Sequence, residues 1–190
     1  NHPQSLIISS TLEKIKKNKE NKTRLGVVVP LTGETAASGQ QILQGIQLAV
    51  NETFLAQDGT NLEVITKDSE SEPIEEIVQE LAIDPNIIGI VGPARSKFVK
   101  KVASLADIYR LPIFTPSASS AGLAELSPYV FTNVVTRELQ GKYIAKYAVN
   151  TLGLYRFVVF YPLESYGFEL KDSFIEEIES LGGEVVFVVS

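Results

Sequence analysis

The chain has 190 residues, a net charge of −6, no cysteine and a single histidine, His2, near its amino terminus. The lack of cysteine excludes disulfide bonds, thiolate metal sites and cysteine nucleophiles, and a histidine in the tail leaves serine–histidine catalysis without a plausible base. Residues 1–24 hold six Lys/Arg against two Glu, so the rest of the chain is acidic and we expect no binding to nucleic acid. Composition therefore favours a binding protein over an enzyme.

The sequence also contains no methionine. We therefore expect a processed chain or a piece of a longer one, from which a signal segment has been removed. No apolar run approaches the roughly 20 residues that a membrane-spanning helix needs.

Residues 1–23 are predicted to form a leader helix followed by a polar linker. Within this stretch, Ile8, Leu12 and Ile15 recur at the spacing of one helical face. The leader belongs to no strand–helix unit, so we expect it to lie outside the main fold.

From residue 24 onward, short apolar runs alternate with segments of helical periodicity. This alternation predicts an α/β fold with doubly wound, mostly parallel sheets. We expect Gly45 to let its helix approach the sheet closely. The predicted strands span residues 25–31, 62–67, 87–91, 111–114, 129–131, 157–161 and 185–189. The predicted helices span residues 40–54, 73–83, 96–109, 137–152 and 166–181, and the fourth of them is expected to bury Leu139, Tyr143, Ile144 and Tyr147.

Two features indicate two lobes. Residues 127–136 form an extended, helix-poor passage that suits a crossing between sheets, and the last strand has no later segment to cover its edge. We therefore predict an amino-terminal α/β lobe over residues 24–131 and the start of a second lobe over residues 132–190.

Polar turns follow two neighbouring strands of the predicted first sheet. Gly92-Pro93 leads to Ser96, and Thr115-Pro116 leads to Ser117 and Ser119. In a right-handed strand–helix–strand unit both turns lie at the carboxyl edge of the sheet, where open α/β sheets bind ligands. Two interpretations remain open for each serine, a ligand contact or an ordinary helix cap or turn residue.

Metal and nucleotide chemistry are disfavoured. The acidic residues between Asp68 and Glu76 lack the alternating ligands and the glycine of an EF-hand, so a solvated helix start explains them better. The glycines Gly33 and Gly39 do not form a dinucleotide-binding fingerprint. We expect no metal ion and no cofactor. Arg95, beside the first polar turn, either attracts an anion or faces solvent.

Five segments together resemble the type I periplasmic ligand-binding proteins, in particular the leucine/isoleucine/valine-binding receptors of ABC transporters. They are LGVVVPLTGETAASGQQILQGIQLAVNE, IIGIVGPARS, LPIFTPSAS, YVFTNVVTRELQGKYIAKYAV and FVVFYPLESYGFEL. The resemblance runs from about Arg24 to the last residue. It implies the periplasmic binding protein type I fold, with two α/β lobes joined by three crossovers that close over a small ligand, and it implies that both lobes are incomplete in this chain.

The resemblance also implies ligand contacts at matching positions. The α-carboxylate of an amino acid would be held by Ser96 and by the turn of Ser117, Ala118 and Ser119. Ser38 falls where many members have an aromatic side chain over the ligand, and Tyr166 corresponds to a tyrosine of the second lobe. The acidic residue that binds the α-ammonium in the family would lie beyond residue 190.

The leading hypothesis is an extracytoplasmic or periplasmic solute-binding protein, lipid-anchored in some arrangements. It would deliver an amino acid or related small carboxylate to the membrane permease of an ABC importer. The alternative is a regulatory or interaction domain of an envelope lipoprotein, which has an envelope protein as its partner and no transport role. An enzyme such as an amide hydrolase is the least favoured class, because the chain lacks cysteine and a usable histidine.

Overall fold

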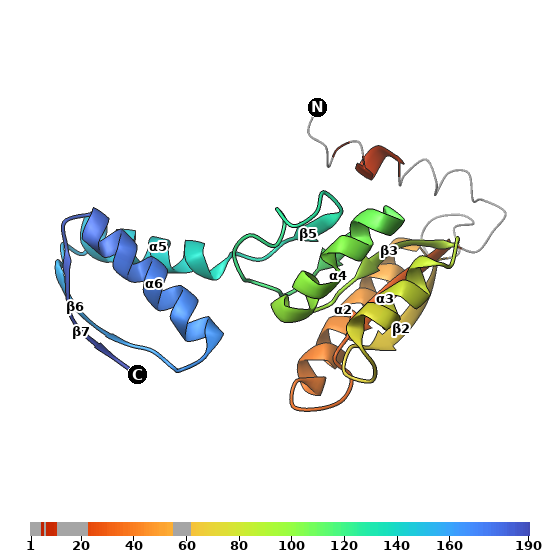
Figure 1. Ribbon diagram of the computed structural model, residues 1–190, viewed down its shortest axis with the longest axis horizontal. Coiled ribbons are helices and arrows are strands. Elements are labelled where there is room, and N and C mark those ends of the chain that lie inside the picture. The colour runs from red at the N-terminus through yellow and green to blue at the C-terminus, as the bar shows by residue number, and fades with distance from the viewer. Residues whose placement is uncertain (1–4, 6, 11–22, 55–61) are drawn as a thin grey trace. The chain divides into compact units, whose positions relative to one another are not determined.

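The computed structural model describes residues 5, 7–10, 23–54 and 62–190 (Figure 1). Residues 5 and 7–10 are helical, in agreement with the predicted leader helix. The rest of that helix and most of the linker lie outside the described residues.

Two compact units make up the chain. Unit 1 comprises Asn1–Ala118 and Gly122–Asn133, and unit 2 comprises Ser119–Ala121 and Val134–Ser190. Unit 1 contains β1 (Thr23–Val29), α2 (Ala36–Phe54), β2 (Leu62–Asp68), α3 (Ile74–Ala82), β3 (Ile87–Val91), α4 (Ser96–Tyr109), β4 (Ile113–Thr115) and β5 (Val130–Thr132). Unit 2 contains α5 (Arg137–Lys146), its π-helical continuation η1 (Tyr147–Thr151), β6 (Arg156–Phe160), α6 (Ser165–Ser180) and β7 (Glu184–Val189).

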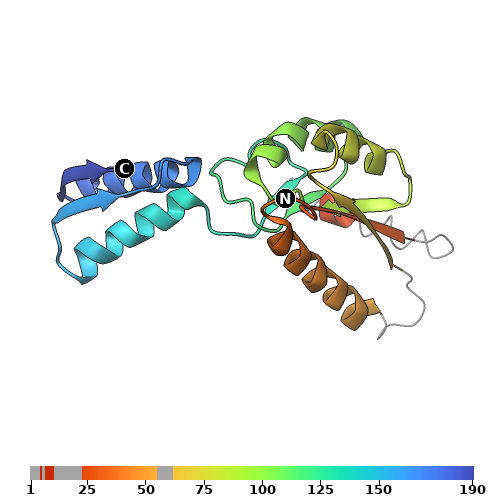
Figure 2. The same cartoon turned by 90° about the horizontal axis from the view of Figure 1, so that it is seen from below.

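The sheet of unit 1 has the strand order β2-β1-β3-β4-β5, and every neighbouring pair is parallel. Helix α2, orange in Figure 2, lies on one side of this sheet, and α3 and α4 lie on the other. Helices on both faces of a parallel sheet confirm the predicted α/β class.

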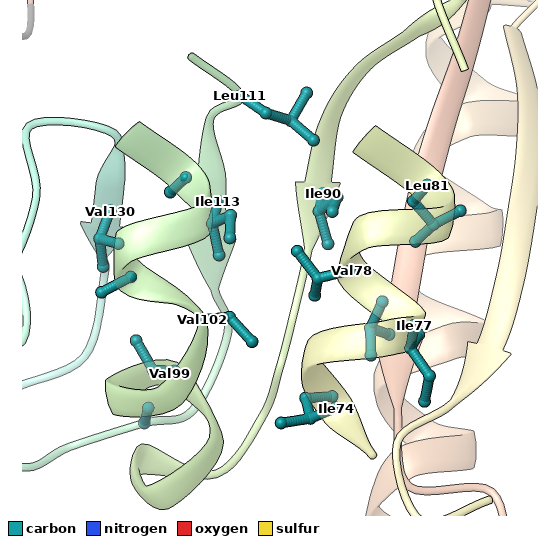
Figure 3. Packing of buried hydrophobic residues seen from close by; sticks show 14 of the residues in the cluster. Ile74, Ile77, Val78, Leu81, Ile90, Val99, Val102, Leu111, Ile113 and Val130 are labelled. Carbon is teal, nitrogen blue, oxygen red and sulfur yellow. The ribbon is translucent and has the colours of Figure 1, made fainter. Parts of the chain in front are cut away.

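The core of unit 1 forms between the sheet and the helices α3 and α4. In α3, Ile74, Ile77, Val78 and Leu81 repeat at the spacing of one helical face, and each is at most 4% exposed. Figure 3 shows these side chains turned toward strand residues such as Ile90. Burial of this stripe holds the strand ends, and the turns that follow them, in fixed positions.

The close approach of α2 to the sheet occurs at Gly39, and the prediction for Gly45 is wrong. A Cβ on Gly39 would come within 1.7 Å of the Pro30 carbonyl oxygen, whereas a Cβ on Gly45 would meet no atom within 4 Å. The glycine next to the β1–α2 turn is therefore the one that the packing requires.

In unit 2, β6 and β7 are parallel neighbours and α5 packs against α6. The predicted inward face of α5 and η1 is wrong, because Leu139, Tyr143, Ile144 and Tyr147 are 46–65% exposed. The buried positions are small, and they include Gly141 and Ala145. A Cβ on Gly141 would lie 2.0 Å from Ser173 Oγ, so the two helices approach more closely than large side chains allow.

Candidate functional site

Four strands of unit 1 end at the same edge of its sheet, because β2, β1, β3 and β4 are parallel neighbours. The turns that follow them begin at Asp68, Pro30, Gly92 and Pro116. In open parallel sheets this carboxyl edge is the usual place for a ligand.

Gly92 shapes the turn between β3 and α4. Its φ is 113°, and a Cβ there would lie 1.9 Å from the Val28 carbonyl oxygen, so only glycine lets the turn pass over the end of β1. Helix α4 then begins at Ser96, with Arg95 in the extended cap position and no side-chain cap bond. The interpretation of Ser96 as an N-cap is therefore wrong, and its half-buried side chain sits in the first helical turn.

Two side-chain hydrogen bonds join this turn to the one after β4. Thr115 Oγ1 donates to the Pro93 carbonyl oxygen at 2.8 Å, and Ser117 Oγ donates to the Ala94 carbonyl oxygen at 2.9 Å. The amide of Ala118 donates to Thr115 Oγ1 at 3.2 Å. Ala118 is only 2% exposed, so its methyl group belongs to the core and its backbone alone can meet a ligand.

Asp68 organises the turn between β1 and α2. Its carboxylate accepts from the Leu31 amide at 2.8 Å, from Thr32 Oγ1 at 2.7 Å and from the Glu70 amide at 3.1 Å. Burial by itself raises the pKa of Asp68, but the hydrogen bonds from Thr32, Leu31 and Glu70 outweigh it, so the pKa is lower than usual. The sequence analysis took Asp68 for part of a solvated acidic run and missed this role.

Ser38 lies in the first turn of α2 and is exposed to solvent. Next to this turn, the surface of unit 1 is hollowed by about 250 Å³. The hollow is lined by Thr32, Gly33, Glu34, Thr35, Glu70 and Arg95. Arg95 Nη1 and Glu70 Oε1 are 3.3 Å apart, so a cation and an anion meet in its wall.

The other two predicted contacts belong to unit 2, where both meet Arg137. Ser119 accepts from Arg137 twice, at Oγ from Nε at 3.1 Å and at its carbonyl oxygen from the amide at 2.9 Å. The guanidinium carbon lies 5.3 Å from the ring centroid of Tyr166. Glu169 Oε1 is 3.4 Å from Arg137 Nη1 and accepts from Ser120 Oγ at 3.1 Å.

Arg137 is the residue that the sequence analysis missed in unit 2. It lies 18 positions from Ser119, at the start of a helix where a charged residue is unremarkable. No local spacing pattern joins the two positions.

Unit 2 also contains a second hollow, of about 360 Å³, between the end of β6 and the helices α5 and α6. Tyr166 contributes to its lining, which is mainly apolar. Within the described ranges, no group of three Asp, Glu or His side chains is arranged to hold a metal ion, and none of the helices is long and apolar enough to cross a membrane.

Solved structures of solute-binding proteins share this fold. The chain is 28% identical to a branched-chain amino acid transporter substrate-binding protein from Streptococcus pneumoniae in complex with isoleucine, with a TM-score of 0.74 over 89% of this chain and 49% of that one. It is 25% identical to a solute-binding protein of an ABC transporter from Rhodopseudomonas palustris in complex with 3,4-dihydroxybenzoic acid, with a TM-score of 0.76 over 88% and 46%.

A third structure, an ABC transporter substrate-binding protein from Sphaerobacter thermophilus, is 26% identical, with a TM-score of 0.79 over 88% of this chain and 47% of that one. The chain thus spans about half the length of these structures. The comparison with curated proteins gave no significant match. The family model described as periplasmic binding protein matches residues 22–189. The chain therefore belongs to the periplasmic binding protein family, among the type I members related to the branched-chain amino acid receptors of ABC transporters.

Proposed function

We propose that the chain is part of an extracytoplasmic solute-binding protein, which delivers an amino acid or related small carboxylate to the membrane permease of an ABC importer. Residues 24–131 would belong to its amino-terminal lobe and residues 132–190 to the second, with the ligand held between them and no catalytic step. Membership of a family of solute-binding proteins supports this role. The relatives bind different ligands, so the ligand class rests on the chain's own residues.

The observation that supports the site best is the pairing of the turns after β3 and β4. The bonds from Thr115 to Pro93 and from Ser117 to Ala94 hold Ser96 and Ser117 at one edge of the sheet. The first N–H groups of an α-helix have no acceptor within the helix, and they attract anions. The start of α4 and the Ser96 hydroxyl therefore suit a carboxylate.

Ser117 suits a different part of the ligand. A hydroxyl has one proton, and that of Ser117 is donated to the Ala94 carbonyl oxygen. Only its lone pairs remain for a ligand, so we assign to it a donor such as an ammonium or a hydroxyl group. The backbone of Ala118, together with Ser38, completes the proposed contacts of the first lobe, and Ser119 and Tyr166 are those of the second.

The test is calorimetric titration of the full-length protein with L-amino acids and hydroxybenzoates. A hydrogen bond to a charged group contributes about 1.5–3 kcal/mol, so Ser96→Ala should weaken binding about 10- to 100-fold. Ser104→Ala is the matched control, because Ser104 is an exposed serine on the same helix, and it should leave affinity unchanged. Equal affinity of the Ser96→Ala variant and the wild type would rule out this carboxylate site.

A flat titration across the whole panel would favour the interaction domain of an envelope protein instead. In that case the partner is a protein, and neither serine variant has a small-molecule affinity to lose.

A further inference from the structure

The hollow beside the β1–α2 turn, here called the charged hollow, is unusual in its lining. It is formed by Thr32, Gly33, Glu34, Thr35, Glu70 and Arg95. Two hydroxyls, two carboxylates and a guanidinium therefore stand where a pocket for an aliphatic side chain would have leucine, valine or aromatic residues.

The walls of the charged hollow are held in place before any ligand arrives. Asp68 binds the Thr32 hydroxyl and the Glu70 amide, so a single carboxylate ties two of its sides together. Arg95 lies between Glu70, at 3.3 Å, and the ring of Phe98, whose centroid is 5.7 Å from the guanidinium carbon. Such preorganised groups lose little freedom when they bind.

The charged hollow is next to the proposed carboxylate site. Arg95 directly precedes Ser96, and the carbonyl oxygen of Ala94 accepts from Ser117. A small ligand with its carboxylate at the start of α4 would therefore have its distal group within reach of Arg95 and Glu70.

The Arg95–Glu70 pair remains partly open to solvent, with side-chain exposures of 42% and 25%. An aliphatic group placed there would remove water from both charges and give back no hydrogen bond, and each polar group left unpaired costs about 1–3 kcal/mol. A carboxamide or hydroxyl group both accepts, from Arg95, and donates, to Glu70, so it replaces the water that it displaces.

We propose that the charged hollow is the subsite for the distal group of the ligand, and that it selects small carboxylates with a carboxamide or hydroxyl group over branched aliphatic ones. This inference rests on the proposed solute-binding function. It separates the chain from a receptor for leucine, isoleucine or valine.

The experiment uses pairs of ligands with nearly the same shape, titrated into the full-length protein. The pairs are L-asparagine with L-leucine, L-threonine with L-valine, and 4-hydroxybenzoate with 4-methylbenzoate. In each pair that binds, the polar member should bind at least about tenfold more tightly, since a binding site with unpaired polar groups rejects the analogue that lacks the hydrogen bond.

Variants test whether the charged hollow is the source of this preference. Arg95→Gln and Glu70→Gln should each reduce the preference within a pair at least about threefold, an effect smaller than the loss of a whole charged hydrogen bond. Lys101→Gln and Glu75→Gln are the matched controls, because they remove another exposed ion pair of unit 1, with an Nζ–Oε1 distance of 3.6 Å, that is not part of the hollow. The controls should leave the preference unchanged.

The outcomes separate the two proposals. Tighter binding of the aliphatic members, or an unchanged preference in both hollow variants, overturns the charged hollow as a selective subsite and leaves solute binding intact. Absence of binding by all six ligands overturns both.

Discussion

Gly141 offers a sharp test of how unit 2 is packed. A Cβ at this position would lie 2.0 Å from Ser173 Oγ, 2.8 Å from the Leu170 carbonyl oxygen and 3.0 Å from the Phe174 amide nitrogen. Two of these three neighbours are backbone atoms of α6, which cannot turn away as a side chain can. The Gly141→Ala substitution must therefore push α5 and α6 apart.

The expected magnitude follows from two opposing effects. Alanine stabilises a helix interior by about 0.5–1 kcal/mol relative to glycine. Overpacking of a well-packed contact costs about 1–3 kcal/mol, and a clash with backbone belongs at the upper end of that range. We expect a net loss of about 2 kcal/mol in unit 2, which is about a 30-fold increase in the population of locally opened states.

Hydrogen exchange measured by mass spectrometry on the full-length protein reports each unit separately. Amides of α5 and α6 should exchange about 30-fold faster in Gly141→Ala than in the wild type. Gly45→Ala is the matched control, because a Cβ at Gly45 meets no atom within 4 Å. It should slow exchange in α2 by up to about fivefold through helix propensity alone. Slower exchange of α5 in Gly141→Ala would refute the close helix contact.

Two further predictions concern the turns around the proposed site. Because the pKa of Asp68 is lowered in the folded protein, its ionised form stabilises the fold above the pKa of an unfolded aspartate, about 3.9, and this contribution is lost as the pH falls through the folded value. Asp68→Asn should therefore lower the urea midpoint at pH 6 and have a smaller effect at pH 3; an equal effect at both would contradict the role of the charge. Arg137→Gln, which removes the bonds to Ser119 and Glu169, should speed amide exchange at residues 119–121 about 3- to 10-fold, with a smaller effect for Arg137→Lys. Unchanged exchange at these residues in the Gln variant would show that Arg137 does not hold them.

Local patterns in the sequence were sufficient to predict the elements. The strand over residues 87–91 and the helix over residues 96–109 have the predicted bounds. Their apolar runs, periodicity and glycine or proline breaks act over a few neighbouring residues. The strand predicted over residues 111–114 instead begins at Ile113, because Pro112 has no N–H to donate to a sheet.

The same patterns placed the candidate serines in the turns after β3 and β4, and these turns are where the structure has them. They could not show which groups each serine meets. Ser117 donates its proton to Ala94, and Ser119 is held by Arg137 in the other unit. These partners lie 18 or more positions away in the chain, at distances where periodicity carries no information.

The burial of α5 shows the same division. Its sequence predicts a face of leucine, isoleucine and tyrosine toward the core, but the partner helix approaches so closely that only Gly141 and Ala145 fit between them. Sequence alone determined the α/β order of elements, the polar turns at the strand ends and the resemblance to a ligand-binding family. Only the tertiary structure decided which face of α5 is buried, that Asp68 fixes the first turn, and that Arg95 and Glu70 share one hollow. Each of these depends on contacts between segments that the chain brings together only when the sheet and its helices have packed.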